Sequence, residues 1–261
     1  MEREYAVGIV QREAERVLQL ANSDGADLTA PVPSCPDWDF LQLVKHLGNV
    51  YNWAGTIVEG RLTAPPGPEM PRQPEGVSNM DWLSDRLDRI LLALREVPED
   101  AEMWNFLAAS PGPPAFWWRR QMHETVIHRV DAELACALPV TALEPDLAAD
   151  NIAEVFELLR FAEVSGNADE GAVEPASEAK DAADAPTALI IHLHATDLPG
   201  AEWTIDTVAR TITREHAKGD VAIRGPAWSL ARWCWSRPVG AEIEVFGDLE
   251  TAEQWRRTVG L

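Results

Sequence analysis

Hydrophobic side chains recur every three or four residues through the first 163 positions, which is the spacing of amphipathic helices. Pro33 and Pro36 break the chain ahead of the second helix, for which Asp37 is a suitable N-cap, and Ser78 with Asp81 forms an acidic variant of a capping box at the third. The pattern predicts helices at 4–20, from about 37, at 78–97, at 116–137 and at 147–160. Four of these are long enough for an up-and-down arrangement, so residues 1–163 are predicted to form an all-α four-helix bundle.

From residue 188 onward the hydrophobic period changes to that of strands. Alternating apolar and polar positions predict strands at 189–194, 202–205, 211–213, 221–223 and 242–246. Gly225-Pro226 is expected to start a helix that continues to Trp235, and a last helix is predicted at 249–259. Residues 188–261 are therefore predicted to form a small α+β domain.

The segment between these two regions, residues 164–187, has a different composition. From Ser165 to Thr187 it carries six acidic residues and one lysine, and almost no large apolar side chain. Such a segment cannot bury enough surface to order itself, which predicts a flexible acidic linker. An acidic docking segment is the alternative interpretation.

The charge balance narrows the classes of partner. The chain has 22 basic against 43 acidic residues, a net charge of −21. Because nucleic acids and anionic membrane surfaces attract lysine and arginine, neither is an expected partner. Hydrophobic residues at 46% and charged residues at 25% are ordinary for a folded protein.

Localisation is predicted from three further features of the sequence. No run approaches the roughly 20 apolar residues of a membrane span. The first residues lack the basic-then-apolar layout of a signal peptide. The cysteines, about a hundred residues apart, form no CxxC pair, and they are Cys35, Cys136 and Cys234. A reduced, cytoplasmic protein is therefore predicted.

Two histidines and a glutamate in the fourth helix are candidates for chemistry. His123 and His128 are five residues apart, about 140° around a helix, so they cannot both bind one ion from a regular helix. Glu124 and His128 are four apart and share a face. His123 falls on the apolar face, where a packed core histidine is favoured over a ligand. From this helix alone, a solvated Glu124–His128 pair is favoured over a pair that lines a cleft.

A histidine in the second helix changes that balance. His46 lies at the edge of the apolar face, with Trp53 two turns further along the same side. With Glu124 and His128 it would form a set of two histidines and one carboxylate. Zinc commonly takes three such ligands and leaves a fourth position for water or substrate.

Two groups of residues in the first half carry a resemblance to the mycothiol-dependent maleylpyruvate isomerase family. Cys35-Pro36-Asp37-Trp38, followed by His46-Leu47-Gly48, resembles the "CPxW…HLG" opening of that family. The second group resembles its "HExxxHRxDAE" signature and runs from His123 to Glu133. Three segments of the second half are similar to the family's second domain, namely 192–197, 221–227 and 245–248.

The resemblance implies a fold and a set of ligands. The first domain would be a DinB-like four-helix bundle, and the second would be similar to sterol carrier protein. A divalent metal, zinc, would be held by the residues that match His46, Glu124 and His128, which favours the metal site over the solvated pair. Mycothiol, a small-molecule thiol, would be the cosubstrate.

The second domain contributes one further candidate. Arg237 matches the end of the family's "WLxGR"-like stretch and would bind a substrate carboxylate, whereas a surface arginine is the alternative. Ser236 stands where glycine is usual, so the local turn departs from the pattern. His192 and His194 share one face of a strand, which is compatible with a metal, although a structural role is favoured.

Two other features of the first domain bear on its chemistry. Cys35 precedes a helix N-terminus that would stabilise a thiolate, but its place in the entry turn favours packing over nucleophilic attack. Trp53 and Trp117 are the tryptophans expected to wall a cleft.

The residues and the resemblance together predict an enzyme that uses an activated mycothiol thiolate. Attack on a small electrophile would yield either an S-conjugate or, if the thiolate departs again, cis–trans isomerisation of a maleylpyruvate-type substrate, with S-transfer slightly favoured. The alternatives are a metal-dependent hydrolase that needs no thiol and a non-catalytic protein that binds a small ligand.

Overall fold

The computed structural model describes residues 2–67, 70–107, 110–165, 189–209 and 211–258. The chain divides into two compact units, Met1–Thr141 and Ala142–Leu261, and each is described by itself. Among the described residues, no helix is both long and apolar enough to cross a membrane.

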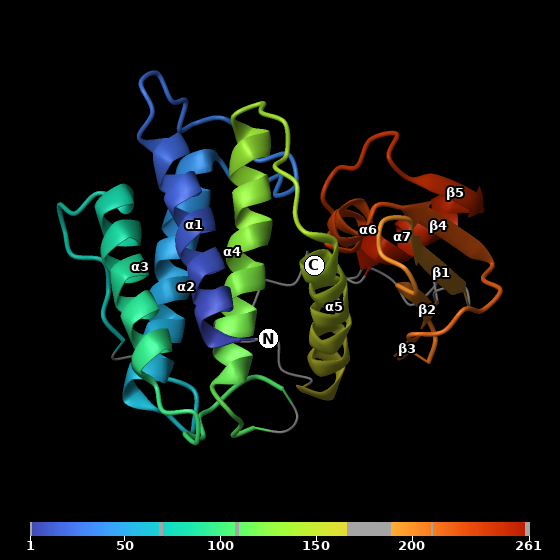
Figure 1. Ribbon diagram of the computed structural model, residues 1–261. Coiled ribbons are helices and arrows are strands. Elements are labelled where there is room, and N and C mark those ends of the chain that lie inside the picture. Colours follow the sequence, from blue (N-terminus) through green and yellow to red (C-terminus); the bar gives the residue numbers. More distant parts are fainter. Residues whose placement is uncertain (1, 68–69, 108–109, 166–188, 210, 259–261) are drawn as a thin grey trace. The chain divides into compact units, whose positions relative to one another are not determined.

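The N-terminal unit is a bundle of four helices that lie side by side (Figure 1). Helix α2 packs mainly against α3, and α1 packs mainly against α4. The predicted four-helix bundle is thus confirmed, with helices α1 (Arg3–Ala21), α2 (Phe40–Gly60), α3 (Asn79–Glu96) and α4 (Ala115–Ala135).

The start of α2 differs from the prediction by two residues. Asp39, and not Asp37, is the N-cap: its carboxylate accepts a hydrogen bond from the backbone N–H of Gln42 at 2.7 Å. The Gln42 side chain in turn accepts from the Asp39 backbone N–H at 2.8 Å, which completes a capping box. At α3 the prediction is confirmed, because the Ser78 hydroxyl accepts from the backbone N–H of Asp81 at 3.1 Å.

Gly48 sets the distance between α2 and α3. A Cβ atom at this position would lie 2.5 Å from Cδ1 of Trp82, closer than side chains pack. The missing side chain therefore lets the Trp82 ring lie against the α2 backbone, where its indole N–H donates to Asn49 at 3.3 Å. This close approach is the structural reason for the glycine that follows His46-Leu47.

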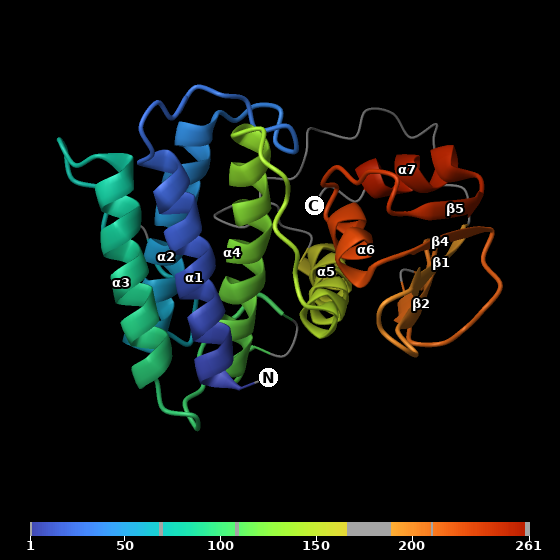
Figure 2. The same ribbon diagram turned by 45° about the horizontal axis from the view of Figure 1, so that its top comes forward.

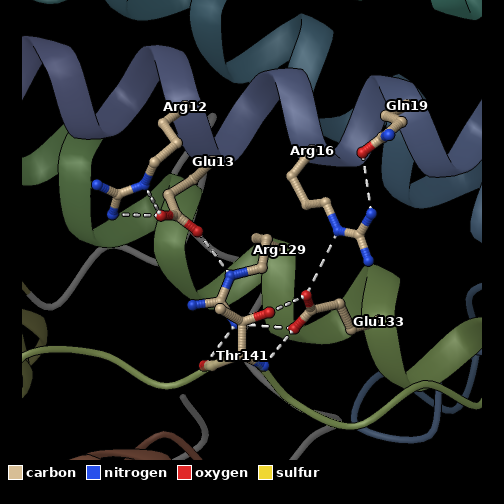
Figure 3. A network of polar contacts seen from close by, with 7 residues as sticks. All are labelled: Arg12, Glu13, Arg16, Gln19, Arg129, Glu133 and Thr141. Atoms are coloured by element: carbon tan, nitrogen blue, oxygen red, sulfur yellow. Dashed lines mark hydrogen bonds and ion pairs between the residues drawn. The ribbon is translucent and has the colours of Figure 1, made fainter.

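Helix α4 is buried at every residue from Arg120 to Glu133, its polar residues included. Arg129 joins it to α1, because its guanidinium donates to Glu13 at 2.7 Å and to Glu133 at 2.8 Å (Figure 3). Glu133 also accepts from the backbone N–H and the hydroxyl of Thr141, at 2.8 and 2.6 Å. The network fixes the rotation of α4 against α1 and ties down the chain that leaves α4.

The C-terminal unit is a five-stranded mixed sheet with helices (Figure 2). The strand order is β3-β2-β1-β4-β5, in which only β1 and β4 run parallel. Helix α6 packs on β1 and β4, and α5 packs on α6. The predicted small α+β domain is confirmed, with α5 (Pro145–Ser165), β1 (Ile190–Ala195), β2 (Glu202–Asp206), β3 (Thr211–Thr213), β4 (Val221–Gly225), α6 (Ala227–Cys234), β5 (Glu244–Gly247) and α7 (Leu249–Thr258).

The division between the compact units differs from the boundary predicted at residue 163. Helix α5 belongs to the C-terminal unit, because its packing partner there is α6. Hydrophobic spacing shows that a helix has an apolar face but not which neighbour covers it. The predicted acidic linker at 164–187 lies almost wholly outside the described residues.

A left-handed residue ends α6. Ser236 has a φ of 60°, and the backbone N–H groups of Ser236 and Arg237 donate to the carbonyls of Trp233 and Arg232 at 3.0 and 2.8 Å. These bonds form a Schellman motif, in which glycine is usual at the left-handed position.

We expect Ser236→Gly to stabilise the protein by roughly 0.5–1 kcal/mol, because glycine adopts a positive φ without the steric cost that Cβ imposes. Urea denaturation measures the effect. The matched control, Ala231→Gly in the interior of α6, should destabilise by about 1 kcal/mol. Destabilisation by both substitutions to a similar extent would contradict the prediction.

Candidate metal centre

A turn before α2 brings two side chains to the site. The backbone N–H of Trp38 donates to the Cys35 carbonyl at 2.8 Å, and Val32 N–H donates to the Trp38 carbonyl at 2.9 Å. The turn presents the Trp38 ring to His46, with ring centroids 4.6 Å apart. It also brings the Ser34 hydroxyl into a hydrogen bond with Asp131. The Cys-Pro-x-Trp segment therefore shapes the surroundings of the histidines.

Three predicted site residues meet between α2 and α4. Nε2 of His46 lies 3.2 Å from Oε1 of Glu124, and Nε2 of His128 lies 3.1 Å from the same oxygen. The two imidazole rings are 4.8 Å apart between centroids. The candidate ligand atoms all lie within 4.8 Å of one another. The earlier interpretation of Glu124 and His128 as a solvated pair is wrong, because their side chains are only 11% and 9% exposed.

Asp131 determines how His128 presents its ring. Its carboxylate lies 2.9 Å from Nδ1 of His128, one helical turn earlier, and is itself fully buried. A proton on Nδ1 that is donated to Asp131 leaves Nε2, which faces Glu124 and His46, as the nitrogen that could bind an ion once its own proton is displaced. Ligand histidines in metal sites are commonly oriented by a carboxylate in this way.

Arg120 holds the other oxygen of Glu124. Its guanidinium forms an ion pair with Oε2, one helical turn away, while Oε1 faces both histidines. Burial by itself would raise the pKa of Glu124, but the charges of Arg120 and His128 outweigh it and hold this pKa well below its usual range. The glutamate is therefore an anion at any pH near neutrality.

The pKa values of the two histidines shift in opposite directions. Burial lowers the pKa of His46 below its ordinary value, and the hydrogen bond to the Glu124 carboxylate only partly offsets this. Burial also acts to lower the pKa of His128, but Glu124 and Asp131 together raise it to about 9. Without an ion, His128 is therefore protonated on both ring nitrogens and positively charged at neutral pH, whereas His46 is neutral.

These donors fit a zinc-like ion. Zinc–ligand bonds of about 2.0–2.1 Å at tetrahedral angles place ligand atoms about 3.3 Å apart. The nitrogen–oxygen separations of 3.1 and 3.2 Å around Oε1 of Glu124 are close to that value. Imidazole nitrogens and carboxylate oxygens are also common zinc ligands in proteins. His46 is the most exposed of the three, with 28% of its side chain accessible.

The other candidate residues of the first domain lie in the core, in the entry turn or in an aromatic cluster. His123 is completely buried, as a core histidine should be. Cys35 is half-buried in the entry turn. Trp53 and Trp117 pack against each other at 5.2 Å between ring centroids, in an aromatic cluster whose further members are Trp104, Phe106 and Phe116. Trp38 packs against the site histidines, with its ring centroid 4.6 Å from that of His46 and 6.1 Å from that of His128.

Arg237 lies in the C-terminal unit and is only 6% exposed, so the surface-arginine interpretation is wrong. Its guanidinium donates to the Trp235 carbonyl at 2.7 Å. The left-handed turn at Ser236 forms in spite of the missing glycine and directs the chain into this buried position.

Sequence reasoning missed the roles of Arg120, Ser34 and Trp38. Arg120 lies four residues before Glu124, and this spacing is the signal that could have indicated the ion pair. Ser34 and Trp38 gave no such signal, because they meet α4 and α2 only through the tertiary fold. Asp131 lies three residues after His128, a spacing that places the two side chains side by side on a helix, but the sequence indicates no function for it.

The fold and this cluster define a class of protein: a four-helix bundle with a buried histidine–glutamate centre, joined to a small α+β unit. Residues 10–133, most of the bundle, match the family model described as the mycothiol maleylpyruvate isomerase N-terminal domain. The resemblance indicated by the sequence motifs is thereby confirmed.

Two solved structures are similar over both units. One is the mycothiol-dependent maleylpyruvate isomerase, at 17% identity and a TM-score of 0.53, with 94% of this chain and 93% of that chain covered. The other is a histidine-to-alanine mutant of the mycothiol-dependent maleylpyruvate isomerase, at 16% identity and a TM-score of 0.52, with 89% and 88% covered. At this identity the similarity establishes the fold. None of the curated proteins compared with the chain matches it significantly.

Proposed function

We propose that this protein is a metal-dependent enzyme that uses mycothiol as a nucleophile on a small electrophilic substrate. The observation that carries the proposal is the convergence of His46 and His128 on one oxygen of Glu124, in a bundle most of which matches the mycothiol maleylpyruvate isomerase N-terminal domain. A divalent ion, zinc, would be held by these three side chains. The similar solved structures, named as mycothiol-dependent isomerases, agree with a thiol cosubstrate.

Bound zinc would lower the pKa of a coordinated thiol, so that the thiolate is present near neutral pH. His46 and His128 would act as neutral donors through Nε2. Asp131 would retain the proton on Nδ1 of His128 and fix the ring. Arg120 would keep Glu124 ionised and hold its second oxygen away from the ion.

The reaction would begin when the sulfur of mycothiol forms a bond with an electrophilic carbon of the substrate. If that carbon belongs to a conjugated double bond, the bond becomes single, rotates, and expels the same thiolate, which gives cis–trans isomerisation. If another group leaves instead, the product is an S-conjugate. Both outcomes need the same ligands and the same thiol, so we propose the shared nucleophile and treat S-transfer and isomerisation as its two forms.

One experiment separates this function from its alternatives. Zinc-loaded protein is incubated with a panel of small electrophiles, including cis-configured keto acids, with and without mycothiol, and products are identified by mass spectrometry and chromatography. We expect turnover only when mycothiol is present. Turnover without any thiol would support a hydrolase instead, and tight ligand binding without turnover would support a binding protein.

Arg237 is proposed to bind a substrate carboxylate. Its planar, permanently charged side chain suits bidentate pairing with carboxylates. We expect Arg237→Ala to raise KM for carboxylated electrophiles by at least about tenfold, with unchanged metal content, because losing a charge-assisted hydrogen bond costs about 1.5–3 kcal/mol. Arg237→Lys is the control that keeps the charge and should lose less. An equal loss for uncharged electrophiles would contradict a carboxylate-binding role.

A further inference from the structure

A second group of metal-ligand side chains lies in the C-terminal unit, on one face of its sheet. His192 and His194 alternate along β1 with the apolar residues Ile191 and Leu193, which are fully buried on the opposite face. Glu202 on β2 is the cross-strand partner of His194, so it shares the face of the histidines. Strand register alone therefore places a carboxylate beside two imidazoles.

The connection between β3 and β4 adds a third histidine. The Thr204 hydroxyl donates to the Glu215 carbonyl at 2.8 Å and holds this connection beside β2. It places His216 next to the same glutamate, with its ring 5.0 Å from that of His192 between centroids. Residues separated by up to 24 positions in the sequence thus meet at one carboxylate.

The contacts of this cluster resemble those of the bundle site. Nε2 of His192 lies 3.0 Å from Oε2 of Glu202, and Nδ1 of His216 lies 2.5 Å from the same oxygen. Nδ1 of His194 lies 3.2 Å from Oε1. The ligand atoms of His192, Glu202 and His216 all lie within 4.8 Å of one another. Small side-chain rotations would bring them to the roughly 3.3 Å separations of a tetrahedral zinc ion.

We propose that His192, Glu202 and His216 form a second divalent-metal site, independent of the bundle site, which takes zinc or a similar borderline ion. Two imidazoles and one carboxylate supply the ligands, and solvent completes the coordination. His192 is 8% exposed and is held by the sheet, whereas His216 is 77% exposed and is carried by the connection. A bound ion would therefore fasten the β3–β4 connection to the β1–β2 hairpin.

The site would be easier to empty than the bundle site. Its ligands are more accessible to water and chelators, and one of them must be ordered with its loop when the ion binds. Because the ion binds only the folded arrangement, it should stabilise the protein in proportion to its free concentration above Kd. Amide hydrogen exchange in the β3–β4 connection should slow when zinc is added.

Equilibrium dialysis of the full-length protein against buffered zinc tests the site. We expect about two ions per chain in the wild type and about one in either His216→Ala or Glu202→Gln, because each change removes one of three ligands. The matched control is Glu215→Gln, which alters the neighbouring exposed acid and should bind as much zinc as the wild type. Combining His216→Ala with His46→Ala and His128→Ala should abolish stoichiometric binding.

The outcomes for the two sites are separable. If His216→Ala and Glu202→Gln bind as much zinc as Glu215→Gln, the sheet site does not exist, whatever the bundle does. If zinc slows amide exchange in the β3–β4 connection of the His46→Ala/His128→Ala protein, and His216→Ala removes that effect, the sheet site stands even when the bundle binds no metal. Unchanged exchange in that protein overturns it.

Discussion

His128→Ala should empty the bundle site and remove thiol-dependent turnover. His128 supplies one of the three proposed ligands and lies 3.1 Å from the shared oxygen of Glu124. Removing an outer-shell partner of a metal site already costs about 10–100-fold in affinity, and the loss of a ligand itself should cost more. We expect the metal content of the bundle site to fall from about one tightly held ion per chain to almost none. Turnover with mycothiol should fall at least about a thousandfold.

The measurement is elemental analysis together with the mycothiol-dependent assay, both made in a His216→Ala background so that zinc on the sheet is not counted. His123→Ala is the matched control, since His123 lies on the same helix and is completely buried. It should lower the free energy of unfolding by about 1–3 kcal/mol yet keep its metal. Equal metal content in the His128→Ala and His123→Ala proteins would contradict the ligand assignment.

Zinc affinity of the bundle site should rise with pH up to about 9. In the ion-free site Glu124 and Asp131 raise the pKa of His128 to about 9, against the opposing effect of burial, so zinc must displace one proton at neutral pH. The apparent affinity should therefore increase about tenfold per pH unit between ~6.5 and 9 and level off above. Burial lowers the pKa of His46, so its proton competes only at more acidic pH.

The same proton affects the stability of the ion-free protein. A histidine whose pKa is raised on folding stabilises the fold most below its unfolded value of ~6.5, and this contribution disappears as pH rises through about 9. Glu124 has the opposite sign: its lowered pKa stabilises the fold above the unfolded value, and the contribution is lost in acid. Chelator-treated protein should thus lose stability between ~6.5 and 9, whereas zinc-loaded protein should not.

Asp131→Asn distinguishes the source of this pH dependence. The substitution removes a buried negative charge 2.9 Å from Nδ1 of His128 while it keeps the size of the side chain. The pH above which zinc affinity no longer rises should decrease. The limiting zinc affinity above that pH should fall by about 10–100-fold. Zinc titration against a competing chelator from acidic to alkaline pH measures both. Affinity in the wild type that does not change between ~6.5 and 9 would show that His128 carries no proton to displace.

The residues of the "HExxxHRxDAE" signature have two separate roles in this structure. Glu124 and His128 are proposed metal ligands, and Asp131 orients the His128 ring. Arg129 and Glu133 point elsewhere, into the network that joins α4 to α1 and to Thr141 (Figure 3). The second set holds the rotation of α4, and that rotation decides whether Glu124 and His128 face α2. The signature thus combines proposed metal ligands with residues that hold their helix in place.

Much of the fold was predictable because it depends on local patterns. The spacing of apolar residues predicted the four helices of the bundle and the change to strands near residue 188. Ser78 and Asp81 marked the start of α3 through a hydrogen bond between residues three apart. The four-residue spacing of Glu124 and His128 placed them on one face before any tertiary contact was known.

Only the tertiary structure decided which faces are buried and which distant residues meet. From helix α4 alone, the sequence favoured a solvated Glu124–His128 pair, because a polar helical face is usually exposed. In the structure the pair is buried, and ion pairs with Arg120 and Asp131 compensate its charges. The sequence assigned α5 to the bundle, because an apolar helical face does not show which neighbouring element covers it. It could not bring Ser34 to Asp131, or His216 to Glu202, because such contacts depend on how loops cross the helices and the sheet. The local sequence determined the elements and the ligand types, and packing between distant segments determined the sites.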